Sequence, residues 1–139
     1  MTNRARRALQ LFEPDAEITE EELLSYRADT KYHPQSHIMQ MVVDLVTTPS
    51  DDPLVKEAQE VLRNWDGDTV KESRGAALAV ITGTRALGYE YIKPEADPME
   101  MLQKTASDLK EKYGRLDPQW GEINRIQRGD VDMLSLIHI

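Results

Sequence analysis

Two histidines separated by four positions are the first residues of this sequence whose spacing points to chemistry. His33 and His37 have the spacing at which two imidazoles on one face of a helix can bind the same metal ion. Pro34 lies between them, however, and places His33 ahead of any helix that starts there. Asp44 lies two turns beyond His37, but spacing fixes no further strong ligand. We therefore expect no metal and no cofactor, and we interpret both histidines as surface or capping residues.

A short acidic turn, Asp66-Gly67-Asp68, is the next candidate, because its composition is similar to that of a calcium-binding loop. An EF-hand also needs a third oxygen ligand and a glutamate at position 12 of its loop, and that position is Ala77 here. Ser73 lies nearby, but it has neither the motif of a nucleophile elbow nor a base placed by spacing. We expect no calcium site, and we expect Ser73 to cap the helix that follows.

Three arginines near the N-terminus, Arg4, Arg6 and Arg7, form a basic start to an otherwise acidic chain. An arm that binds nucleic acid would need aromatic residues among its cations and a basic surface around it. The chain has 17 basic and 25 acidic residues and a formal net charge of −8, which disfavours sequence-independent binding to nucleic acid phosphates. We interpret the arginines as a solvated helix face with one of them turned inward. Trp65 and Trp120 are interpreted as core anchors rather than ligand stackers.

The composition limits the remaining classes of protein. The chain has 139 residues, of which 40% are hydrophobic and 30% charged, so it can bury a core as a single domain. It has no cysteine, which excludes disulfides and thiolate chemistry. No apolar run approaches the ~18 residues that a membrane-spanning helix needs. The first residues do not have the pattern of a signal peptide either.

Capping residues and prolines divide the sequence into helical segments. Each segment has apolar residues at the i, i+3, i+4 spacing of a buried helix face. The first predicted helix spans residues 4–13, is capped by Asn3 and ends before Pro14, and a short helix follows the Thr19/Glu22 capping box. The third spans residues 38–46, and the fourth runs from Asp52-Pro53 to Gly67. The last two run from Ser73 to about residue 89 and from Asp97-Pro98 to Gly114.

These patterns predict a mainly α fold with at most one or two short strands near the C-terminus. Residues 123–127 are the predicted strand. The segment from Gly75 to Ile81 has no polar face and is predicted to be buried on most sides. The residues that we expect in the core are Leu45, Leu62, Trp65, Leu78 and Ile81. Composition and periodicity alone indicate a helical domain and name no function.

Four motifs, taken in order, resemble the penicillin acylase family of N-terminal-nucleophile hydrolases, which includes the acyl-homoserine-lactone acylases. The resemblance covers residues 3 to about 130. The first motif is Asn3-Arg4-Ala5-Arg6-Arg7 with Leu11-Phe12-Glu13, which is similar to the helix after the oxyanion asparagine, and the second is Ile18-Thr19 with Asp29. The third is Trp65-Asp66-Gly67 with Ser73 and Ala76-Ala77-Leu78. The fourth is the segment from Leu109 to Gly114 with Trp120-Gly121-Glu122 and Arg125.

The resemblance implies an αββα fold and hydrolysis of an amide bond between an acyl chain and an amine. In that family, a serine freed at the N-terminus of the β chain attacks the carbonyl, and its own α-amino group is the base. A backbone N–H and an asparagine side chain hold the oxyanion. By this pattern the nucleophile, its amine and the oxyanion asparagine lie upstream of Met1. The chain is then an internal β-chain fragment that is inactive alone, and residues 1–133 are an incomplete helical part.

The resemblance also implies roles for single residues. Arg4 corresponds to an arginine with a supporting catalytic role, for which a rigid, permanently charged guanidinium is suited. In the Trp-Asp-Gly motif, Trp65 packs, Asp66 caps local N–H groups and Gly67 supplies a left-handed position. The implied partners are the remainder of the acylase α and β chains and an N-acyl small molecule, with no nucleic acid and no membrane. The implied location is the periplasm or outside the cell.

The C-terminal end departs from the family pattern. Family members continue beyond the equivalent of Gln127-Arg128-Gly129 into glycine-rich strands, whereas here residues 134–139 resemble a translated sequencing adapter and are expected to be a non-native tail. A different class of function remains open, namely a freestanding acidic helical module whose groove binds a partner helix or peptide. A third functional hypothesis is an acidic regulatory protein that contacts a basic surface. An upstream reading frame with a processing site and an oxyanion asparagine would favour the acylase.

Overall fold

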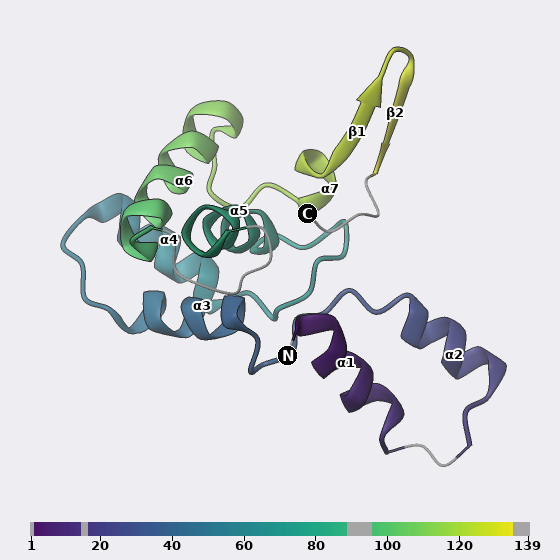
Figure 1. Ribbon diagram of the computed structural model, residues 1–139. Coiled ribbons are helices and arrows are strands. Elements are labelled where there is room, and N and C mark those ends of the chain that lie inside the picture. Colours follow the sequence, from purple (N-terminus) through teal and green to yellow (C-terminus); the bar gives the residue numbers. More distant parts are fainter. Residues whose placement is uncertain (1, 15–16, 89–95, 135–139) are drawn as a thin grey trace.

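The computed structural model describes residues 2–14, 17–88 and 96–134, and most of these lie in helices (Figure 1). This confirms the predicted mainly α fold with two short strands near the C-terminus. In chain order the elements are α1 (Asn3–Phe12), α2 (Glu20–Arg27), α3 (His37–Thr47), α4 (Pro53–Arg63), α5 (Ala76–Leu87), α6 (Pro98–Tyr113), α7 (Trp120–Ile123), β1 (Arg125–Arg128) and β2 (Val131–Leu134).

Helix α5 lies at the centre of the core, in contact with α3, α4 and α6 (Figure 1). Residues 76–80 at its start are at most 4% exposed, as expected for a helix segment without a polar face. Leu45, Leu62, Trp65 and Leu78 are also buried, which confirms four of the five predicted core residues.

The fifth predicted core residue, Ile81, is only partly buried, so that prediction is wrong. Ile81 shares a helical stripe with Thr84 and Arg85, which are also of intermediate exposure. This stripe is the side of α5 that the neighbouring helices cover incompletely. A uniformly apolar segment does not reveal which of its faces remains partly open, because every face has the same composition.

The structure confirms the two predicted helix N-termini that consist of an aspartate followed by a proline. The Asp52 carboxylate accepts hydrogen bonds from the N–H groups of Leu54 and Val55, and Pro53 occupies the first turn. Asp97 caps α6 in the same way. The capping box between Thr19 and Glu22 is present with both of its hydrogen bonds. Side chains three residues apart are enough to form these contacts, so the local sequence specifies them.

Two predicted N-caps are wrong. The cap of α1 is Thr2, whose hydroxyl accepts from the Ala5 N–H, and Asn3 is the first helical residue. Ser73 does not cap α5, which begins at Ala76 after Gly75 and has no side-chain cap. The backbone of Ser73 instead forms a turn with Val70 and accepts a hydrogen bond from the Trp120 N–H. This long-range contact holds the segment outside the helix.

Two element bounds also differ from the predictions, and a third predicted bound falls on a residue outside the described ones. Helix α4 ends at Arg63 with Asn64 as its C-cap, so Gly67 lies in a separate turn. Helix α5 ends at Leu87, and residue 89, the predicted end, is outside the described residues. The predicted strand at 123–127 begins at Arg125, because the preceding residues form α7. Strand β1 pairs antiparallel with β2, with Arg125 opposite Leu134.

Helices α1 and α2 form an arm beside the core, which we call the α1–α2 arm (residues 3–27; Figure 1). Neither helix has a buried residue, and Leu9 and Phe12 are 49% and 38% exposed. Phe12 makes an edge-to-face contact with Tyr26 of α2, with ring centroids 5.2 Å apart. No helix in the described ranges is both long enough and apolar enough to cross a membrane.

Candidate functional site

The Trp-Asp-Gly motif forms a turn between α4 and α5, which we call the motif turn (residues 65–69). The Asp66 carboxylate accepts from the Asp68 N–H at 3.0 Å, and Gly67 has a φ of +81°. The Trp65 indole donates to the Asp68 carbonyl at 2.8 Å and the residue is 8% exposed. These contacts confirm the three expected roles: Trp65 packs, Asp66 caps an N–H, and Gly67 supplies the left-handed position.

Glycine is also required where the indole of Trp65 meets the start of α5. A Cβ atom placed on Gly75 would lie 2.4 Å from Trp65 Cβ and 2.7 Å from Trp65 Cγ. On another side, the ring of Tyr32 makes an edge-to-face contact with the indole, with centroids 5.9 Å apart. Trp65 therefore joins the motif turn to both the central helix and the segment that carries Tyr32.

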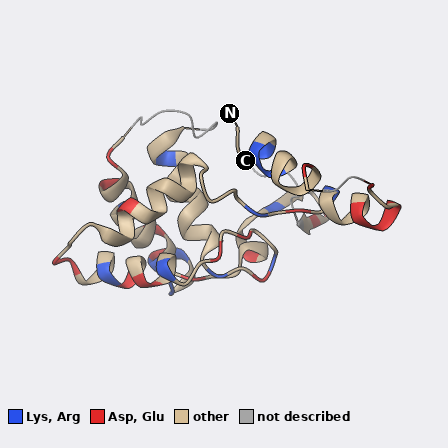
Figure 2. Ribbon diagram, turned by 90° about the horizontal axis from the view of Figure 1, so that it is seen from below, with Lys and Arg blue, Asp and Glu red and all other residues tan. Residues whose placement is uncertain are grey.

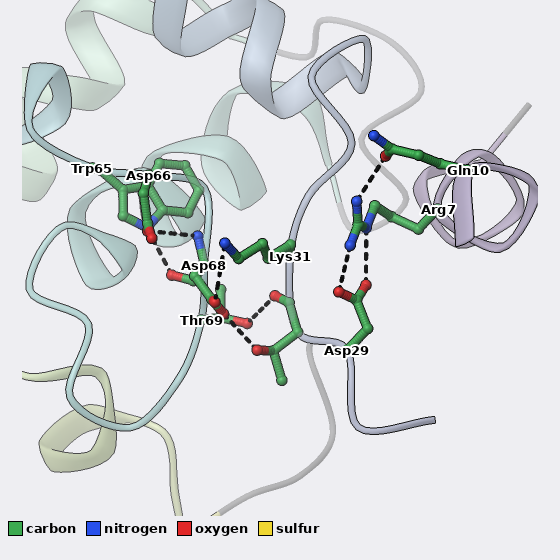
Figure 3. A network of polar contacts seen from close by, with 9 residues as sticks. Arg7, Gln10, Asp29, Lys31, Trp65, Asp66, Asp68 and Thr69 are labelled. Atoms are coloured by element: carbon green, nitrogen blue, oxygen red, sulfur yellow. Dashed lines mark hydrogen bonds and ion pairs between the residues drawn. The ribbon is translucent and has the colours of Figure 1, made fainter. Parts of the chain in front are cut away.

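That segment, residues 29–33, runs beside the motif turn like a short strand (Figure 3). Lys31 and Asp68 form an isolated antiparallel β-bridge. The Tyr32 N–H donates to the Gly67 carbonyl at 2.9 Å. The two stretches are more than thirty residues apart in the sequence, so only the tertiary fold brings them together.

Side chains reinforce this pairing. Both the N–H and the hydroxyl of Thr69 donate to the Thr30 carbonyl, the hydroxyl at 2.8 Å. The Thr30 hydroxyl donates to the Asp68 carboxylate at 2.5 Å, and Lys31 Nζ lies 3.9 Å from the same carboxylate. The Asp68 side chain is only 17% exposed, so its charge is held by partners rather than by bulk water. The result is a polar connection fixed at several points.

Helix α1 attaches to this segment through Arg7. Its guanidinium donates Nε–H to Asp29 Oδ2 at 2.9 Å and a terminal N–H to Asp29 Oδ1 at 2.5 Å, a bidentate pair (Figure 3). The two side chains are 14% and 17% exposed. The hydrogen bond that Arg7 donates to Asp29 raises the pKa of Arg7 above its ordinary value. Gln10, on the same helix, accepts from the remaining terminal nitrogen at 2.7 Å.

Two weaker contacts accompany that pair. The His33 N–H donates to Asn3 Oδ1 at 2.7 Å, and Arg6 donates to Gln35 Oε1 at 3.2 Å. Asn3 therefore serves the tertiary structure rather than capping its own helix. The expectation that one of the three arginines turns inward is met by Arg7.

Arg4 lies in the first turn of α1 and is exposed. Within the described parts of the chain its guanidinium makes no hydrogen bond or ion pair. Its supporting catalytic role stays a prediction. Sequence reasoning did not identify Arg7 and Asp29 as a pair, because 22 residues separate them and no local pattern connects them. Their presence in two successive family motifs was the available signal.

The histidines are not brought together into a metal site. His33 Nδ1 accepts from the Gln35 N–H at 3.0 Å, and His37 is the first residue of α3. Among residues 2–14, 17–88 and 96–134, no three His, Asp or Glu side chains gather in a way that could hold a metal ion.

An open groove of about 550 Å³ lies next to the motif turn, between α4 and the start of α5. Five of its twelve lining residues are acidic, among them Asp66, Glu72 and Asp117. Arg74 also lines it and donates to the Asp117 carbonyl at 3.2 Å. Ser73 borders the groove, but its hydroxyl has no hydrogen-bonded base in the described structure. The described residues that line the groove therefore include no assembled nucleophile.

The family of the chain follows from one comparison. No curated protein sequence matches the chain. The family model described as penicillin amidase matches residues 1–135, which include the arginine-rich helix, the motif turn and both strands. Because this match spans nearly the whole sequence, the chain belongs to the penicillin amidase family, a family of acylase-type hydrolases.

Proposed function

We propose that this chain is a helical part of the β chain of an acylase that hydrolyses N-acyl amide bonds. Membership of the penicillin amidase family carries the proposal. In this proposal the nucleophilic N-terminal serine, its α-amino group and the oxyanion asparagine are supplied by the rest of the enzyme. The chain contributes the scaffold around the motif turn, because that turn is the best-connected polar feature among the described residues.

In such an enzyme, separate groups supply the nucleophile, the base and the donors that stabilise the oxyanion. The serine hydroxyl attacks the amide carbonyl carbon, and the neighbouring α-amino group takes the proton, since a serine alone is a weak nucleophile. Preorganised N–H donors stabilise the negative charge on the carbonyl oxygen. In the family, α1 follows the oxyanion asparagine. The exposed guanidinium of Arg4 is thus available to hold polar groups of the remaining acylase, which is the supporting role that we propose for it.

Further parts of the proposal follow from the family resemblance. The partners are the remainder of the α and β chains and an N-acyl small molecule, such as an acylated antibiotic or quorum signal. The location is the periplasm or outside the cell. Residues 1–133 are the native helical part, and residues 134–139 are a non-native tail.

A second candidate function is a freestanding module that binds a partner helix. The observation in its favour is the set of exposed leucines on the α1–α2 arm, since Leu9, Leu23 and Leu24 are 49%, 50% and 57% exposed. The acylase proposal accounts for the same surface as an interface with the rest of the enzyme.

Amine release from an N-acyl substrate tests the proposal. We expect hydrolysis by a processed acylase that contains this segment and none by the 139-residue chain alone, because the attacking group is absent from the chain. Replacing the N-terminal serine of the processed enzyme by alanine is the control and should abolish amine release. Hydrolysis by the isolated chain, or an inactive processed enzyme, would overturn the proposal.

A further inference from the structure

We propose that Arg7 and Asp29 are positioning residues of the acylase, which set the orientation of α1 and of Arg4 relative to the helical core. This inference rests on the proposed function, since it assigns the pair an effect on the rate of amide hydrolysis. Neither residue is placed in contact with substrate. They act through the helix that they hold.

Helix α1 lacks an apolar attachment to the core. None of its residues is buried, and its largest apolar side chains, Leu9 and Phe12, remain well exposed. Phe12 packs on Tyr26 of α2, which has no buried residue either. Apolar burial is the usual force that fixes a helix on a domain, at about 25 cal/mol per Å² of buried area. In this arm polar contacts must determine the orientation of α1.

The bidentate geometry of the Arg7–Asp29 pair restrains the orientation of α1. Two parallel N–H···O bonds fix both the distance and the angle between a guanidinium and a carboxylate, whereas a single contact fixes only the distance. The side chains are 14% and 17% exposed, so water competes weakly for these bonds. The other side-chain contacts of α1 with the segment after Asp29 are single hydrogen bonds, from the His33 N–H to Asn3 Oδ1 at 2.7 Å and from Arg6 to Gln35 Oε1 at 3.2 Å. The pair is therefore the most restrictive side-chain contact that α1 makes in the described structure.

Asp29 leads directly into the segment held by the motif turn. Thr30, the next residue, accepts two hydrogen bonds from Thr69. The motif turn is in turn fixed by Trp65, which packs on Gly75 at the start of the central helix. Figure 3 shows this sequence of contacts from the indole to the arginine of α1. The position of the central helix is thereby transmitted to α1 through the motif turn and residues 29–33.

The Arg7–Asp29 pair differs from the other charged groups of the α1–α2 arm. Figure 2 shows basic residues on α1 and acidic residues at the start of α2, where Glu20, Glu21 and Glu22 form the first turn. Of these charges on the arm, Arg7 is the one that is bound to a carboxylate close to the core. Exposed charges elsewhere on the arm are solvated and contribute little to its orientation.

Steady-state kinetics of the processed acylase test the inference. Arg7→Ala and Asp29→Asn should each lower kcat about 10- to 100-fold with KM changed less than about threefold, because a displacement of ~1 Å at a positioned group costs up to ~100-fold. Arg7→Lys keeps the charge but loses the bidentate geometry, so its kcat should be intermediate. Exchanging the pair, Arg7→Asp with Asp29→Arg, should recover part of the kcat that either single change loses.

The matched control is the Arg85–Asp108 pair between α5 and α6, whose nitrogen and oxygen atoms lie 2.7 Å apart. Arg85→Ala removes an ion pair of the same chemistry that has no contact with the arm. We expect it to lower the melting temperature without lowering kcat. Equal losses of kcat in Arg7→Ala and Arg85→Ala would show a general structural effect and refute the positioning role.

Hydrogen exchange of the 139-residue chain distinguishes failure of the positioning role from failure of the proposed acylase function. It can also be measured when a variant of the processed acylase is expressed poorly. Arg7→Ala should speed amide exchange in α1 at least tenfold and leave α5 unchanged. Unchanged exchange in α1, or a folded Arg7→Ala acylase with the kcat of the parent enzyme, would refute this inference alone. A parent acylase that hydrolyses no N-acyl amide would instead refute the proposed function, while the exchange result would still decide whether the pair anchors α1.

Discussion

Replacing Trp65 by alanine is the sharpest test of the structure, because this one side chain joins three parts of the chain. The indole is 8% exposed, packs on Gly75 and makes an edge-to-face contact with Tyr32. Its N–H donates to the Asp68 carbonyl at 2.8 Å. Trp65→Ala removes all three contacts together and leaves a cavity that the surrounding helices fill only in part.

The expected loss of stability follows from these contacts. Truncating a packed tryptophan to alanine costs about 3–5 kcal/mol in the free energy of unfolding. Within that range, the aromatic pair with Tyr32 accounts for about 0.5–1.5 kcal/mol and the hydrogen bond to Asp68 for about 1 kcal/mol. A domain of this size has a total stability of about 5–15 kcal/mol, so the variant should be close to unfolding.

Urea unfolding followed by far-UV circular dichroism is the appropriate assay, because the signal comes from the helices and does not depend on tryptophan. Trp65→Phe is the matched control. It keeps a ring beside Tyr32 and loses the indole donor, so we expect a cost of about 1–2 kcal/mol. A loss below ~1 kcal/mol for Trp65→Ala would refute the packing described here. Equal losses in both variants would assign the stabilisation to the hydrogen bond rather than to the ring.

Three further changes test the structure at separate points. Gly75→Ala should cost about 1–3 kcal/mol by overpacking and shift the fluorescence of Trp65, because the new methyl group would overlap the indole. Asp52→Ala should cost about 0.5–2 kcal/mol in urea unfolding by removing the α4 cap, whereas Asp52→Asn, which keeps an acceptor, should cost much less. The hydrogen bond from Arg115 lowers the pKa of Asp117 below its ordinary value of 3.8, so the pair stabilises the fold above that pH. The stability difference between the parent chain and Asp117→Asn should therefore shrink as the pH falls below 3.8 and disappear once the pH is below the lowered pKa of Asp117, and a difference that persists in stronger acid would contradict this assignment.

The motif turn shows how much of the site was accessible to sequence reasoning. The expected roles of Trp65, Asp66 and Gly67 are all present, because each depends on contacts within or beside one short turn. The pairing of this turn with residues 29–33 was not predicted. It depends on backbone hydrogen bonds between stretches that carry no complementary pattern, so only the folded chain reveals it.

The N-terminal helix shows the same division. Its apolar stripe of Ala5, Ala8, Leu9 and Phe12 predicts a helix correctly, yet none of these residues is buried in the structure. Amphipathic spacing specifies a helix and a preferred face, but whether another surface covers that face depends on the arrangement of distant elements. The stripe is free to contact the remainder of the acylase in the proposed function.

The sequence by itself determined the helices α1 to α6, the caps at Asp52, Asp97 and Thr19, and the end of α6 at Gly114, because these features depend on residues within one or two turns of each other. Helix α7 was not predicted. Motif order was also sufficient to indicate the family. Only the tertiary structure decided that Arg7, rather than a neighbouring arginine, binds Asp29, and that Ser73 lies outside the helix it was expected to cap. Such contacts join positions far apart in the sequence, and a side chain selects its partner only after packing has placed the candidates within reach.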